Sequence, residues 1–166
     1  MRKSTRSLLI LAVAAIALGV AVYVELAHER RLAPQPLTAL DPASVTHLEI
    51  HCRSYTTRVF DRVDGVWHMR TPHDAPANPE AVARLLAIVR ASVRTRAKLA
   101  DYDAAKLGLE PPQFTVVAND TRIVIGGEDP IDHDRYVRIG DELLRVPDRF
   151  SARLLEAPES ELLDPK

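Results

Sequence analysis

The chain has 166 residues with a formal net charge of -1, from 22 Lys and Arg against 23 Asp and Glu, and 46% of its residues are hydrophobic. This length allows one domain with an appendage, and the near-neutral charge without a basic stripe excludes the usual ways of binding nucleic acid. Cys52 is the only cysteine, which excludes an internal disulfide.

The N-terminal segment has the composition of a membrane anchor. Residues 8–24, LLILAVAAIALGVAVYV, contain no charged side chain, and at about 1.5 Å per residue they match a short bilayer-spanning helix. Arg2, Lys3 and Arg6 precede the run, which favours a cytoplasmic N-terminus and an exported remainder. We expect an uncleaved signal-anchor or transmembrane helix over residues 1–26. A cleaved signal peptide is the alternative, because small residues occur in the run at cleavage spacing.

The predicted anchor carries a candidate contact of its own. Ala15 and Gly19 are small residues four positions apart, a spacing that lets a second membrane helix approach closely. The alternative is an alanine-rich single span that faces only lipid. Residues 27–39 follow as a polar linker with Pro34 and Pro36, which indicates a short and fairly stiff spacer.

The folded domain is expected over residues 40–157 and begins with three strands. VTHLEIHC, residues 45–52, alternates in the way of a half-buried strand. TTRVFDRV and VWHMRT follow as two further strands joined at Asp64-Gly65, a strong hairpin signal because both turn positions need positive φ.

A helix is predicted after Pro72 closes the third strand. Asn78 is a good N-cap, and Pro79 suits the first helical position because its missing N–H is not needed there. One apolar stripe follows at helical spacing, consisting of Val82, Leu85, Leu86, Val89 and Val93. We expect this helix to pack on the sheet above Trp67 and Met69.

The second half repeats this order more loosely. Residues 94–112 read as a connector, with one helical turn ending at Gly108. QFTVVAN pairs with DTRIVIGG, and RYVRIG pairs with DELLRVP, as two more hairpins. Asp148 then caps a last helix, and residues 158–166 form a tail. The predicted fold class is therefore α+β: an N-terminal transmembrane helix followed by antiparallel hairpins with two packed helices, arranged as two strand-strand-helix units.

Several of these motifs in this order resemble a bacterial family known as a domain of unknown function, DUF4340. The resemblance rests on VTHLEI, DGVWHMRTP, NPEAVARLLAIV, KLGLEPP, RIVIGG and RYVRIGDELLRVP, over roughly residues 40–155. The matching positions are Trp67, Pro72, Gly108, Leu109, Pro111, Gly126, Tyr136 and Val137, while Leu107 stands where a tyrosine is frequent. The resemblance implies a membrane-anchored, exported module, sometimes found with ABC-type export systems, and it transfers no catalytic residues.

The side chains that could act in catalysis or bind a metal do not form a recognisable catalytic or metal site in the sequence. His47, Glu49 and His51 alternate on one strand face, but the outer two lie about 14 Å apart and cannot share a metal. A third ligand would have to come from His68 or His73, so a solvated polar face is the simpler interpretation. The DPIDHD loop lacks calcium-loop spacing, and no nucleophile elbow or phosphate loop is present. We expect no metal and no cofactor.

These observations favour a non-catalytic, membrane-anchored periplasmic accessory or scaffold subunit of a membrane protein assembly, with an ABC-type export system as the example. The expected location is the bacterial inner membrane, with one N-terminal span and a periplasmic C-terminal domain. Other subunits of the assembly are the expected partners, and nucleic acid is not. The predicted contacts are Ala15 and Gly19, the polar face of His47, Glu49 and His51, and the strand with Tyr136 and Arg138 as a candidate sheet edge. A periplasmic binding module for a lipid, glycan or peptide is the alternative, and a metal-dependent enzyme is less favoured.

Overall fold

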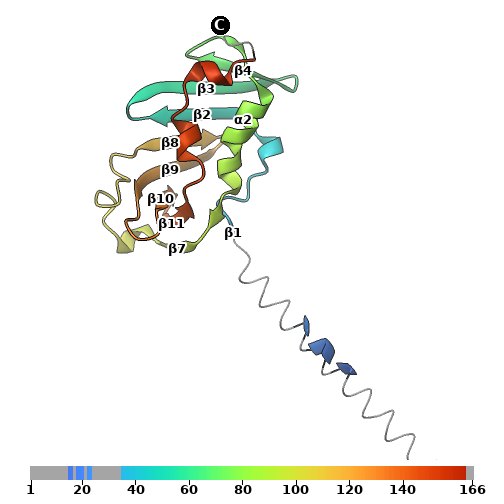
Figure 1. Cartoon of the computed structure of the whole chain (residues 1–166), viewed down its shortest axis with the longest axis vertical. Coiled ribbons are helices and arrows are strands. Elements are labelled where there is room, and N and C mark those ends of the chain that lie inside the picture. The colour runs from blue at the N-terminus through green and yellow to red at the C-terminus, as the bar shows by residue number, and fades with distance from the viewer. Residues whose placement is uncertain (1–14, 17, 21, 24–34, 164–166) are drawn as a thin grey trace, which may run out of the picture. The chain divides into compact units, whose positions relative to one another are not determined.

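The structure is a computed structural model that describes residues 15, 16, 18–20, 22, 23 and 35–163 (Figure 1). The chain divides into two units, Met1–Pro34 and Gln35–Lys166. The described residues of the first unit are helical and exposed. The second unit contains the strands and the hydrophobic core.

The second unit is built around a nine-stranded antiparallel sheet in the order β5-β4-β3-β2-β8-β9-β10-β11-β7. Its strands are β2 (His47–Cys52), β3 (Tyr55–Val63), β4 (Val66–Thr71), β5 (Ala75–Pro76), β7 (Thr95–Lys98), β8 (Phe114–Ala118), β9 (Thr121–Glu128), β10 (Asp134–Ile139) and β11 (Glu142–Pro147). A separate pair is formed by β1 (Gln35–Pro36) and β6 (Ser92–Val93). The α-helices are α2 (Pro79–Leu86) and α3 (Ser151–Leu154), and the 3-10 helices are η1 (Pro42–Ser44), η2 (Ala87–Arg90), η3 (Leu99–Asp101) and η4 (Pro158–Glu161).

The predicted hairpin turns are confirmed by the backbone. Asp64 and Gly65 have φ values of 50° and 82° and join β3 to β4. Asn119 (φ 49°) and Gly140 (φ 56°) turn the chain between β8 and β9 and between β10 and β11. Positive φ is the left-handed conformation that glycine and asparagine tolerate best, so these residue types fix the turns and with them the strand register.

One face of the sheet holds the main core and is covered by helices (Figure 1). Asn78 caps α2 as predicted, with its Oδ1 accepting from the backbone N–H of Glu80 at 3.0 Å. Trp67 and Met69 on β4 are both buried in the same cluster as the apolar stripe of the helix, which confirms that packing. Each buried side chain of this size contributes about 1.5–3 kcal/mol to stability.

The C-terminal segment crosses the same side of the molecule and attaches to β5 and to the start of α2. Ala77 bridges Leu162, and the backbone N–H of Leu163 donates to Pro76 at 3.0 Å. The side chain of Glu161 is buried against Arg58 of β3, with which it forms an ion pair. The segment is therefore part of the fold up to Leu163.

The opposite face of the sheet is covered over only part of its width. Residues 99–109 lie across β9 and β11, where Leu109 packs with Val124 and Leu143 in a second small core. This loop approaches the sheet closely, because the backbone N–H of Gly127 donates to Leu107 at 2.8 Å and a Cβ on Gly126 would lie 2.5 Å from the Leu107 carbonyl oxygen. The two successive glycines thus allow this contact.

The predicted α+β class with two strand-strand-helix units is wrong. β2 pairs with β8, with Ile50 opposite Val116, so the two sets of hairpins form one continuous sheet. The helices are also shorter than expected: α2 ends at Leu86 and passes into η2, and the chain is extended again at Val93. Residues predicted to lie in the helix or in the connector instead form the strands β6 and β7, so the domain is largely β.

The predicted signal-anchor or transmembrane helix over residues 1–26 falls mostly outside the described residues. In the part of the chain that the structure does describe, no helix is long and apolar enough to cross a bilayer.

Candidate functional site

The exposed part of the sheet lies on β2, β3, β4 and β8, on the side away from the helices. Cross-strand partners share a face and neighbours along a strand alternate, so the register identifies the outward residues. We call this surface the open face. It consists of His47, Glu49, His51, Thr57, Val59, Asp61, Val63, Val66, His68, Arg70 and Val117.

A continuous chain of polar contacts runs across the open face. His47 lies between two carboxylates, with Nδ1 2.7 Å from Asp61 Oδ1 and Nε2 2.9 Å from Glu49 Oε1. The second oxygen of Glu49 is 2.8 Å from His51 Nε2. The second oxygen of Asp61 accepts from Arg70 Nε at 3.3 Å. The three polar residues of β2 predicted to share a face therefore do so, and β3 and β4 extend the network.

The network favours a positively charged imidazole at its centre. A neutral imidazole has one N–H, whereas both ring nitrogens of His47 face carboxylate oxygens, which can only accept. The hydrogen bond to Asp61, followed by that to Glu49, raises the pKa of His47 above its ordinary value of 6.5. The same contacts lower the pKa of Glu49 and that of Asp61. These contacts therefore favour the charged forms of all three side chains.

The open face also carries exposed apolar side chains. Val63 and Val66 are directly opposite each other at the end of the β3–β4 hairpin, and they are 47% and 52% exposed. Val59 and Val117 lie on either side of Glu49 in the sheet and are partly exposed. This mixture of valines and hydrogen-bonding groups is suited to contact with another protein surface.

The histidines that the structure describes do not converge on a metal position. His73 Nε2 instead lies 3.0 Å from Glu159 Oε1 of the C-terminal segment. Within the described ranges, no group of three or more His, Cys, Asp or Glu side chains is placed to hold a metal ion. The contacts of His47 and His51 are with carboxylates and a threonine hydroxyl.

The second predicted contact strand lies inside the sheet. β10 pairs with β9 on one side and with β11 on the other, so the expectation that Tyr136 and Arg138 mark a sheet edge is wrong. Tyr136 donates to Asp129 Oδ2 at 2.8 Å, and Arg138 contacts Glu110 Oε1 at 3.1 Å. Both side chains are partly buried and hold neighbouring loops against the sheet.

Ala15 and Gly19 lie in described helical positions of the first unit and are exposed. Among the described residues, no atom lies within 4 Å of the position of a Cβ on Gly19. Contact of these two residues with another helix remains a prediction.

The aspartate-rich loop before β10 is organised by arginine. Arg145 lies against Asp132 and within 3.3 Å of Asp134, and Arg94 Nε is 2.7 Å from Asp134 Oδ2. The backbone N–H of Ile131 donates to Asp129, and this hydrogen bond is the main reason that the pKa of Asp129 is low. Two guanidinium groups offset the carboxylates, so the loop forms a structural ion cluster.

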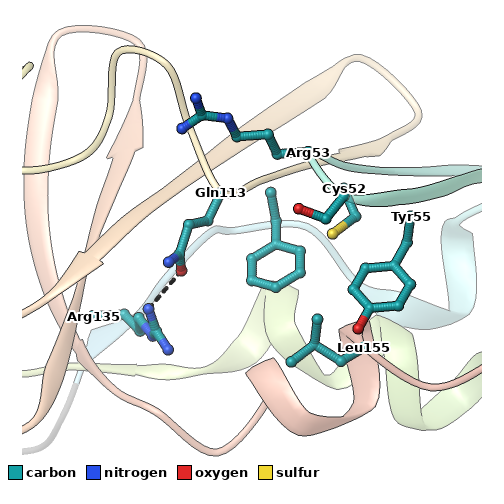
Figure 2. A pocket seen from close by; sticks show the side chains of 8 residues that line it. Cys52, Arg53, Tyr55, Gln113, Arg135 and Leu155 are labelled. Carbon is teal, nitrogen blue, oxygen red and sulfur yellow. Dashed lines mark hydrogen bonds between the residues drawn. The ribbon is translucent and has the colours of Figure 1, made fainter.

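The structure contains a pocket at a place that the sequence did not predict (Figure 2). It has a volume of about 420 Å³ and lies where the turn between β2 and β3 meets the start of β8 and Leu155, just after α3. Gln113 and Arg135 stand on one side of it, and Tyr55 and Leu155 on the other (Figure 2). The pocket could not be predicted because its lining comes from segments far apart in the sequence. The only local feature that pointed to it is the presence of Arg53 and Tyr55 at or beside a turn.

Comparison with known proteins identifies one similarity. A family model described as "Domain of unknown function (DUF4340)" matches residues 67–165. The match begins at Trp67, further along the chain than the resemblance noted in the sequence, and it runs into the C-terminal segment. No curated protein and no solved structure gives a significant match to the chain.

Proposed function

We propose that this protein, which belongs to the DUF4340 family, is a non-catalytic accessory or scaffold subunit that binds another protein of a membrane assembly through its open face. The proposed location is the periplasmic side of a bacterial inner membrane. The charge-free sequence of residues 8–24, preceded by three cationic residues, supports this location. An ABC-type export system is the assembly that the family resemblance suggests.

The observation that carries the proposal is the unequal coverage of the sheet. Residues 99–109 cover the outer side of β9 and β11, whereas the outer side of β2, β3 and β4 carries no segment of the described chain. Val63 and Val66 are exposed on this uncovered face. A partner that covers them would remove apolar surface from water, which favours binding.

The polar network suits this use because it is already ordered in the free protein. Glu49, Asp61 and Arg70 are held by one another and by His47, so few side chains need to be immobilised on binding. Association is opposed by roughly 0.5–1.5 kcal/mol for each side chain that must be fixed, and pre-ordering reduces that term. The expected partner surface has an apolar centre for the valine pair and hydrogen-bonding groups around it.

Site-specific photocrosslinking in intact membranes tests the proposal. A photoreactive residue at Thr57 or Val66 of the full chain is expected to give one discrete, stoichiometric adduct. The matched control is Ala83, an exposed residue of α2 on the helix-covered side, which should give none. Val63→Lys with Val66→Lys should abolish the adduct from the Thr57 position, because two desolvated ammonium groups oppose binding. Equal crosslinking from Ala83, or no adduct at either open-face position, would contradict the proposal.

The proposed location has an independent test. A reporter that is active only outside the cytoplasm, such as alkaline phosphatase fused after Lys166, should be active. A cytoplasmic reporter at the same position should be inactive. The opposite pattern would remove the protein from the periplasm and with it the proposed partner class.

A further inference from the structure

The pocket beside the β2–β3 turn combines an apolar lining with an uncompensated cation. Phe114 lines it and is 4% exposed, while Tyr55 and Leu155 remain 60% and 44% exposed on one of its sides (Figure 2). Exposed rings and aliphatic groups in a concave surface gain free energy when a ligand covers them. These residues lie outside the open face, so the pocket is independent of the function proposed above.

The polar side of the pocket contains two guanidinium groups in different situations. Arg135 is fixed, because its Nε lies 2.7 Å from Asp148 Oδ2 and its Nη1 donates to Gln113 Oε1 at 2.7 Å. Arg53 lies at the exposed turn, and within the described part of the chain no carboxylate is within ion-pair distance of it. Arg53 is therefore the cation with capacity for a ligand, and Arg135 is the group that holds Gln113 in place.

Several hydrogen-bond donors accompany Arg53. Because Gln113 Oε1 accepts from Arg135, its amide group is left with its two N–H donors. Ser54 and Tyr55 also line the pocket, and their hydroxyl groups make no hydrogen bond with the described residues. Donors beside a single cation match an anion with two or three oxygens, and arginine binds a carboxylate through two parallel hydrogen bonds.

We propose that this pocket binds a small organic carboxylate with an apolar body. The carboxylate contacts Arg53 and the adjoining donors, and the apolar body lies on Phe114 between Tyr55 and Leu155. A volume of about 420 Å³ lies within the range of sites for small ligands, roughly 300–1,000 Å³. A free acyl chain and the C-terminal residue of a peptide both have this chemistry.

Calorimetric titration of the full chain with matched ligands tests the proposal. N-acetylphenylalanine and octanoate represent the two sources, and N-acetylphenylalanine amide is the neutral control. We expect at least one carboxylate to bind, and the amide to bind about tenfold more weakly than its acid, because charged hydrogen bonds contribute more than neutral ones. The tighter of the two carboxylates identifies the source. Absence of binding by both carboxylates, or equal binding of the acid and the amide, would overturn the proposal.

Two variants locate the binding within the protein. Arg53→Gln should raise the Kd of the acid about tenfold and leave that of the amide unchanged. Leu155→Glu should weaken binding of both the acid and the amide, because it places a charged group against the apolar body of the ligand. Arg84→Gln, at an exposed arginine of α2, is the matched control and should leave both affinities unchanged. Equal losses in Arg84→Gln and Arg53→Gln would contradict the proposal, and circular dichroism shows whether each variant is folded.

Discussion

Arg58 on β3 and Glu161 near the end of the chain form a buried ion pair across 103 positions of sequence. Their exposed fractions are 2% and 1%. Arg58 also donates to the backbone carbonyl of Leu154 at 2.5 Å, so one guanidinium joins β3 to α3 and to the C-terminal 3-10 helix. The second carboxylate oxygen of Glu161 has no hydrogen-bond partner within the described residues.

The Glu161 carboxyl is expected to make stability depend on pH. Burial raises its pKa from 4.5 to about 7, although Arg58 lies against it. The folded state therefore binds this proton more tightly than the unfolded chain, so the associated stabilisation is present below about pH 4.5 and is lost as the pH rises through about 7. Glu161→Gln should remove this fall in the free energy of unfolding. Urea denaturation from about pH 5 to 8 measures it, and parallel curves for the two proteins would refute the expectation.

Removing one partner of the ion pair should have a much larger effect. Glu161→Ala leaves the Arg58 guanidinium buried without its carboxylate, and we expect a loss of about 3–5 kcal/mol in the free energy of unfolding. Glu159→Ala is the matched control in the same 3-10 helix, since that carboxylate is exposed and contacts only the part-exposed His73. A loss of equal size in both variants would show that the ion pair has no special role.

The imidazole at the centre of the open face is expected to titrate above pH 6.5. Because its folded-state pKa is raised, its contribution to stability is present below about 6.5 and is lost as the pH rises through the raised value. Asp61→Asn should lower the pKa of His47. Asp74→Asn changes a carboxylate that pairs with Arg70 and, among the described residues, does not contact His47, so it should leave that pKa unchanged. Ring resonances followed by NMR report the pKa directly. A pKa of His47 that Asp61→Asn does not change would contradict the network.

The two neighbouring glycines of β9 are expected to respond unequally to alanine. A Cβ on Gly126 meets the Leu107 carbonyl oxygen at 2.5 Å, whereas a Cβ on Gly127 meets it at 3.3 Å. Gly126→Ala should therefore force the loop of residues 99–109 away from the sheet and destabilise the protein by about 1–3 kcal/mol. Gly127→Ala should have a clearly smaller effect in the same thermal-denaturation measurement. The reverse order would mean that the loop does not lie on the sheet as described.

Trp67 gives a simple check of the core. Its side chain is 7% exposed and packs with Met69 and α2, so its emission maximum should be blue-shifted and acrylamide should quench it weakly. The carboxylate ligands of the pocket should not change its emission, because Trp67 does not line the pocket. Strong quenching by acrylamide in the folded protein would place Trp67 outside the core.

Features fixed by neighbouring residues could be predicted from the sequence. The Asn78-Pro79 start of α2 and the Asp64-Gly65 turn each depend on residues a few positions apart, and both are present. The pairing of β2 with β8 could not be predicted in this way, because Ile50 and Val116 are partners that lie far apart in the sequence, with a hairpin and a helix between them. That long-range pairing changes two expected units into one sheet.

In the candidate sites too, features that depend on neighbouring residues could be predicted, and features that depend on long-range pairing could not. The shared face of His47, Glu49 and His51 follows from strand alternation, but the position of Asp61 beside His47 depends on the register between β2 and β3. The burial of Arg58 could not be predicted, because a charged residue in an alternating strand normally faces solvent. Its buried partner Glu161 lies in a segment whose sequence predicts a tail.

The terminal strands of the sheet bear on how the folded domain avoids polymerising. β5 has two residues and ends in Pro76, which lacks an N–H, while β7 has four residues and carries Arg96 and Lys98. Edge strands that are short, contain proline or carry cationic side chains offer few backbone hydrogen bonds to an incoming β-strand. Side-by-side stacking of copies into fibrils is therefore disfavoured, and concentrated solutions of the folded protein should remain free of amyloid.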